Sequence, residues 1–279
     1  MNDLIKNSRY ILLFVVIALV FTLCICLSLA KNDEGKVHIP EITTTQSTTT
    51  TTATTTTTLP KEPDPVPPTP LPPNGITVCV DAGHGWADNG ASSFATDSDG
   101  MPLCFEKDVN LEIAKHLRDR LEFLGYTVIM IRESDDIISP AGIASDNICN
   151  IERRVSWVNT QSDIDLMISV HCDSFTNTAV NGTRIYYNTD KHGETAILGP
   201  LLSEALMNGS VASRAPLLYE DSNKLWSLKQ TKMPSILVEC GFLTGDTDII
   251  NLTDSTYQKS FGTALADGVN EYFDEMKNS

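Results

Sequence analysis

From about residue 75 onward, short apolar runs alternate with longer segments in which apolar residues recur at helical spacing. The apolar runs predict strands, and they cover residues 78–80, 126–131, 165–170, 183–187 and 235–238. The helical spacing predicts helices, and these cover residues 109–124, 151–160, 195–207 and 258–276. Strands that alternate with helices are typical of an α/β fold. We therefore expect a twisted, mostly parallel sheet covered by helices on both faces.

The amino-terminal pattern is different, because residues 10–30 form an apolar run without a single charge. A helix of this length spans the roughly 30 Å hydrocarbon core of a bilayer. Lys6 and Arg9 precede the run, which favours a cytoplasmic segment at residues 1–9 followed by a transmembrane anchor. The alternative is a signal peptide cleaved after residue 30, since Ser28 and Ala30 are small residues at the right spacing, and both interpretations export the rest of the chain.

Residues 31–74 cannot form a packed core. Residues 43–58 are almost all threonine, and a proline-rich stretch follows them. Such a composition predicts a disordered, extended linker and is also typical of an O-glycosylated stalk. We expect the linker to hold a catalytic domain at residues 75–279 away from the membrane.

The charge of the chain excludes one class of partner. The formal net charge is -16, and residues 75–279 carry 15 basic and 30 acidic side chains. A domain this acidic repels phosphate backbones, so we expect no nucleic-acid partner. The seven cysteines contain no CxxC pair, which argues against a zinc knuckle and a full disulfide framework. A single bridge between Cys104 and Cys149 stays open.

Four polar residues are predicted to lie at the same edge of the sheet. His84 belongs to an Asp-Ala-Gly-His-Gly turn that ends the first strand, and Glu106 lies in the loop leading into the first helix. His171 and Glu239 directly follow two further apolar strands. The carboxyl ends of parallel strands meet at one edge, where ligands and catalytic groups collect.

Two histidines and a carboxylate form a ligand set for a catalytic zinc ion, and the remaining carboxylate can act as general base. Taken singly, each residue also has a structural explanation. His84 can be a histidine in a glycine-rich loop, and His171 can be a hydrogen-bonded core histidine. Glu106 can be a charge favoured at a helix amino terminus, and Glu239 can be an ion-pair partner.

Several segments together resemble the zinc-dependent N-acetylmuramoyl-L-alanine amidases of the amidase-3 type. These segments are VCVDAGHGW, FEKDVNLEIAKHLRDRLEFLGYTVIMIRESDD, RRVSWVN, DLMISVHCDS, NGTRIYY and MPSILVECGFLTGDTDIINL. The resemblance covers residues 76–275. It implies that His84, Glu106 and His171 bind zinc and that Glu239 is the second essential glutamate. Asp173 stands where the family usually has asparagine, and Ala82 stands where it usually has proline.

The resemblance implies an enzyme that hydrolyses the amide between N-acetylmuramic acid and L-alanine in peptidoglycan. We expect a single-pass membrane protein with a monomeric catalytic domain on the cell-wall side, or a secreted one if the anchor is cleaved. One alternative is another exported zinc hydrolase, such as a carboxypeptidase or a deacetylase. A second is an inactive wall-binding module, which would be expected to lack a ligand or Glu239.

Overall fold

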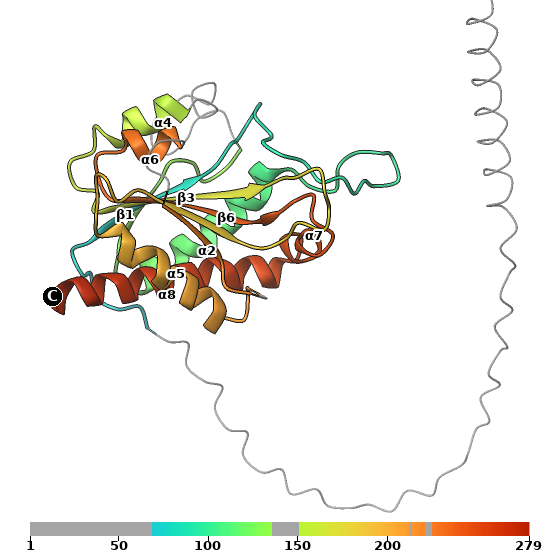
Figure 1. Cartoon of the computed structure of the whole chain (residues 1–279). Coiled ribbons are helices and arrows are strands. Elements are labelled where there is room, and N and C mark those ends of the chain that lie inside the picture. The colour runs from blue at the N-terminus through green and yellow to red at the C-terminus, as the bar shows by residue number, and fades with distance from the viewer. Residues whose placement is uncertain (1–68, 136–150, 213, 221–224, 279) are drawn as a thin grey trace, which may run out of the picture. The chain divides into compact units, whose positions relative to one another are not determined.

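The structure is a computed structural model that describes residues 69–135, 151–212, 214–220 and 225–278 (Figure 1). The expected cytoplasmic segment, the apolar run at 10–30 and most of the linker lie outside these residues, as does Cys149. Within the described ranges, no helix has the length and the hydropathy needed to cross a membrane.

One mixed sheet of six strands forms the centre of the domain. In spatial order the strands are β2 (Thr127–Met130), β1 (Thr77–Ala82), β3 (Leu166–Asp173), β6 (Ser235–Phe242), β4 (Arg184–Tyr187) and β5 (Leu217–Glu220). The run from β2 to β6 is parallel, whereas β4 pairs antiparallel with β6 and parallel with β5. The mostly parallel sheet expected from the sequence is thus a parallel run extended by two reversed strands.

Helices cover both faces of this sheet, as predicted (Figure 1). The first face, which we call the packed face, lies against α2 (Glu106–Phe123), α5 (Thr195–Asn208) and α8 (Ser255–Asn278). The opposite face, which we call the site face, lies against α4 (Ile151–Val158) and α6 (Trp226–Gln230).

The alternation of side chains along each strand explains how the two faces differ. In β3, Leu166, Ile168 and Val170 enter the main hydrophobic core of the packed face, and Met167 enters the smaller cluster on the site face. Successive strand residues point to opposite faces, so neighbouring residues serve different layers. Buried runs on such strands are therefore continuously apolar, which is why the sequence pattern predicted them.

The predicted strands and helices are all present, with ends that differ by a few residues. Strands β3 and β6 continue beyond their apolar parts, so His171 and Glu239 lie within the strands and do not follow them. Glu106 is the first residue of α2 and does not lie in the preceding loop. Three short elements were not predicted, because four or five residues are too few to show a period. These are β5, α6 and α7 (Asp248–Leu252).

Candidate metal centre and active site

The turn that carries His84 is held in an unusual backbone conformation. His84 has a φ of 61°, in the left-handed region that few non-glycine residues adopt. The guanidinium of Arg154 donates to the carbonyl oxygens of Ala82, at 3.0 Å, and of His84. The guanidinium of Arg132 donates to the carbonyl oxygens of Ala82, at 2.8 Å, and of Gly83, at 3.0 Å. Two buried cations therefore fix the turn through its carbonyl groups.

Two glycines make room for the side chains around His84. A Cβ atom on Gly83 would lie 2.2 Å from Cε1 of the His171 ring, far inside van der Waals contact. A Cβ atom on Gly90 would lie 2.5 Å from Oε2 of Glu106 and 2.7 Å from Cδ2 of His84. Only glycine at both positions lets the three polar side chains come together.

The structure brings His84, Glu106 and His171 into one cluster. One ligand atom from each residue lies within 4.8 Å of the other two. Oε1 of Glu106 lies 3.1 Å from Nε2 of His84 and 3.0 Å from Nδ1 of His171, so one carboxylate oxygen contacts both rings. Two imidazoles and a carboxylate are suitable donors for a divalent cation, and the residues present therefore fit a metal site.

Further groups orient these three side chains. Nδ1 of His84 lies 2.8 Å from Oδ2 of Asp88, which leaves Nε2 to face Glu106. The other oxygen of Glu106 accepts a hydrogen bond of 2.8 Å from the backbone N–H of Ala91. A carboxylate on the second nitrogen of a ligating histidine fixes its tautomer and raises its basicity. Asp88 therefore supports the metal site, although sequence reasoning did not single it out.

The charges within the cluster compensate one another. Burial alone would lower the pKa of His84, but hydrogen bonds to Glu106 and Asp88 outweigh it and raise this pKa to about 9. Burial alone would raise the pKa of Glu106, but hydrogen bonds from His171 and His84 outweigh it and hold this pKa well below its usual range. A protonated imidazole and a carboxylate thus form an ion pair, and a metal ion must displace the proton to bind.

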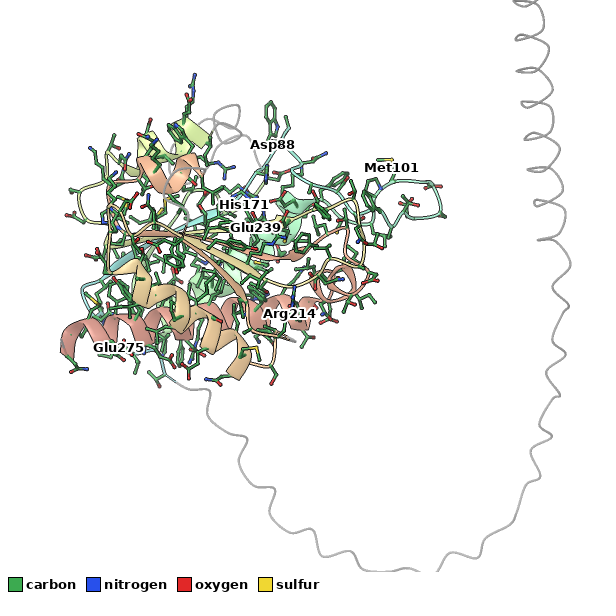
Figure 2. All side chains as sticks on the ribbon, viewed as in Figure 1. Asp88, Met101, His171, Arg214, Glu239 and Glu275 are labelled. Atoms are coloured by element: carbon green, nitrogen blue, oxygen red, sulfur yellow. The ribbon has the colours of Figure 1, made fainter. Side chains whose placement is uncertain are left out.

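Glu239 lies beside this cluster. It is the register partner of His171 on the neighbouring strand β6, and Figure 2 shows the two residues next to each other. Oε2 of Glu239 is buried and has no hydrogen-bond partner among the residues that the structure describes. Burial outweighs the nearby imidazoles and raises the pKa of Glu239 to about 7. A carboxyl group with such a pKa can gain and lose a proton near neutral pH.

A pocket of about 320 Å³ opens above the cluster. His84, His171 and Glu239 line one side, and Trp226 and Leu237 give it an apolar wall. A concave site with a few convergent polar groups and one carboxyl of raised pKa has the features of an enzyme active site.

Comparison with known proteins agrees with this chemistry. Residues 78–271 match the N-acetylmuramoyl-L-alanine amidase family of the amidase-3 type. The chain belongs to this family. The amidase is therefore an enzyme. The family match confirms the expected cleavage of N-acetylmuramoyl-L-alanine amides in peptidoglycan.

Relatives of the amidase support the same assignment. It is 29% identical over 204 residues to the probable cell wall amidase LytH of Staphylococcus aureus, a match that covers 72% of this chain and 60% of LytH. It resembles the CwlD amidase from Clostridioides difficile, solved in complex with the GerS lipoprotein, with 29% identity and a TM-score of 0.59 over 71% of this chain and 98% of that one. The amidase AmiC2 of Nostoc punctiforme gives 26% identity and a TM-score of 0.57, over 72% of this chain and 99% of that one.

The four residues singled out from the sequence thus converge on one pocket, while their individual roles remain predictions. Sequence reasoning missed Asp88, Arg132 and Trp226. Asp88 had a weak signal, because a carboxylate four residues after a candidate ligand can reach its ring. Arg132 and Trp226 had none, because their contacts with the site depend on the tertiary fold.

Proposed function

We propose that the chain hydrolyses the amide between N-acetylmuramic acid and L-alanine with a zinc ion held by His84, Glu106 and His171. The observation that carries this proposal is their convergence beside Glu239, a buried carboxyl whose Oε2 has no partner in the described part of the chain. Mixed imidazole and carboxylate ligands with room for a substrate are typical of catalytic zinc sites.

The zinc ligands, Glu239 and Asp88 have different roles in the proposed reaction. When bound, zinc supplies a Lewis acid that polarises the scissile carbonyl and makes water a stronger nucleophile. Glu239 takes the proton from the attacking water and delivers it to the leaving amine of L-alanine. Burial raises the pKa of Glu239 above the ordinary carboxyl value, which strengthens it as a proton acceptor. Asp88 holds the ring of His84 throughout, by its hydrogen bond of 2.8 Å.

We extend the proposal to the organisation of the whole protein. The uncharged run at residues 10–30 anchors the chain in the membrane, and the linker at 31–74 carries a monomeric catalytic domain at 75–279 to the cell-wall side. The likeness to a probable cell wall amidase supports action outside the membrane. A protein cleaved after residue 30 would act on the same side.

The test uses the full chain, purified in detergent, with intact peptidoglycan as substrate. We expect new L-alanine amino termini that disappear on chelation and return when Zn²⁺ is restored. A carboxypeptidase would instead release carboxyl-terminal amino acids, and a deacetylase would release acetate.

The same assay on Glu239→Gln separates metal binding from proton transfer. This variant should still bind one equivalent of zinc but lose about 10³-fold in rate, within the range for a general base. A rate within a few-fold of the wild type would refute the proton-shuttle role. Failure of the wild type to bind zinc would refute the metal site.

A further inference from the structure

Part of the site face has no helix over it among the residues that the structure describes. Strands β4 and β5 present Arg184, Tyr186, Leu217 and Tyr219 to this face, and we call these four residues the β4–β5 shelf. Leu217 and Tyr219 are 41% and 37% exposed, whereas Ile185, which points to the packed face, is fully buried. The rings of Tyr186 and Tyr219 stack with centroids 4.9 Å apart. Within the described part of the chain, the shelf is therefore an exposed surface with two stacked aromatic rings.

The shelf is continuous with the active site. Arg184 is the register partner of Glu239 in the antiparallel pair of β4 and β6. Opposed residues of such a pair point to the same face, with Cα atoms about 5 Å apart. Asp173 lies two residues beyond His171 in β3, across an irregularity in the register with β6, and its carboxylate contacts Arg184. A row of polar side chains thus runs from the metal cluster across three strands to the shelf.

Arg184 forms an ion pair with Asp173 and lies against two aromatic rings. Its Nη1 donates to Oδ2 of Asp173 at 2.7 Å, and its guanidinium lies 4.6 Å from the centroid of the Phe242 ring and 5.9 Å from that of Tyr219. Nε is buried and has no hydrogen-bond partner among the described residues. Because the side chain is 26% exposed, the guanidinium remains accessible to a ligand. The terminal N–H groups that Asp173 does not use can donate to a further carboxylate.

The catalytic domain at residues 75–279 has a net negative charge. Residues 75–279 carry twice as many acidic as basic side chains, so the surface as a whole repels an anionic substrate. Arg132 and Arg154, two further arginines beside the site, are buried and bound to the His84 turn. Arg184 is thus a partly exposed cation on the same face as the catalytic groups.

We infer that Arg184 is a specificity-determining residue that binds the free carboxylate of the stem-peptide residue that follows L-alanine, an inference that rests on the proposed function. The leaving nitrogen belongs to L-alanine, and the next residue begins one step of about 3.8 Å further along the peptide. This length is of the same order as the Cα–Cα distance of about 5 Å between the paired residues Glu239 and Arg184. When that residue is D-glutamate joined through its side chain, its α-carboxylate is free, and amidation removes the charge.

The experiment compares two soluble muramoyl peptides that differ only at this group, one with the free carboxylate and one with the carboxamide. The zinc-loaded full chain should show a lower KM for the carboxylate substrate. Arg184→Gln should raise the KM for that substrate about tenfold and bring the ratio of the two KM values close to one. Arg184→Lys keeps the charge but loses the fork, and it should restore part of the preference.

The matched control is Arg118→Gln, which removes the same charge from α2, a helix on the packed face, and should leave the KM ratio at its wild-type value. An unchanged ratio in folded Arg184→Gln would overturn the inference. Equal losses on both substrates would overturn it too, because they would mean a structural role.

If the wild type cleaves neither substrate, the proposed function fails, and titration of the dipeptide L-alanyl-γ-D-glutamate into the full chain still tests Arg184. Binding that weakens about tenfold in Arg184→Gln would support the inference. Binding that is absent from the wild type or unchanged in the variant would overturn it.

Discussion

The two faces of the sheet are built from the same strands but serve different purposes. In β3, His171 points to the metal cluster, and the next residue, Cys172, is buried in the main core. In β6, Glu239 and Cys240 divide in the same way. The packed face is apolar and closed by three helices, whereas the site face carries charges and is partly open. One step along a strand therefore separates a residue of the core from a residue of the active site.

The site face also contains polar interactions that a face built for stability would not need. Asp81 is fully buried and pairs with Arg154 at 2.7 Å, and it accepts a hydrogen bond of 2.8 Å from Ser169. Burying an ion pair costs more desolvation energy than burying apolar side chains of similar size, so such a pair adds little net stability. Here the pair positions the guanidinium that holds the His84 turn. The site face uses its buried charges for geometry.

The largest effect is expected on the packed face. Ile168 is fully buried in the core, and Ile168→Ala should lower the free energy of unfolding by about 2 to 5 kcal/mol, because it removes buried methyl groups and leaves a cavity. Catalytic rate per folded molecule should not change. Denaturant unfolding measures the free energy of unfolding. The catalytic rate is measured as turnover divided by the concentration of folded protein. Ile250→Ala is the control, because Ile250 is 69% exposed. A fall in rate per folded molecule would show that the two faces are not independent.

The site face should respond to an added methyl group as strongly as the packed face responds to a lost one. Gly83→Ala would place a Cβ atom 2.2 Å from the His171 ring, and the ring must move out of the cluster. We expect zinc affinity to fall about 100-fold, at the upper end of the effects of disturbed ligand orientation. The matched control is Gly193→Ala, since no atom lies within 4 Å of a Cβ there. Competition with a chromogenic chelator measures both variants, and equal affinities would contradict the argument.

A smaller effect on zinc affinity is expected from Asp88, which contacts the metal cluster through its hydrogen bond with His84. Asp88→Asn keeps the size of the side chain but removes the charge that holds Nδ1 of His84. Zinc affinity should fall about tenfold, and the unfolding curve of the metal-free protein should hardly move. If Asp88→Asn bound zinc as tightly as the wild type, Asp88 would have no orienting role.

The site face also gives the protein a dependence of stability on pH. The pKa of Glu239 is raised to about 7 in the folded, metal-free protein, so folding favours the protonated form. Its stabilising contribution is complete below the ordinary carboxyl pKa of 4.5 and is lost as the pH rises toward 7. Glu239→Gln cannot ionise, and it should gain about 3 kcal/mol relative to the wild type between pH 4.5 and 8, because the pKa rises from 4.5 to about 7 and each pKa unit is worth about 1.4 kcal/mol. Unfolding of the chelated proteins across this range provides the measurement, and a constant difference would contradict the raised pKa.

The same contrast explains how much the sequence could predict. Buried strands such as β1 and β3 produce apolar runs, and residues at their carboxyl ends share an edge, so His84, His171 and Glu239 could be grouped without a structure. Arg132 and Arg184 could not be assigned their contacts, because these depend on which strands become neighbours. The reversal of β4, which places Arg184 opposite Glu239, has no signal in a run of four residues.

The hold of Arg132 and Arg154 on the carbonyl groups of the His84 turn has a consequence for the order of assembly. These contacts involve no metal, so the conformational entropy of the turn is lost during folding and not during metal uptake. Small zinc domains that fold only around their ion differ in this respect. This chain is expected to reach its folded shape empty, and it can then acquire the ion at the place where it works.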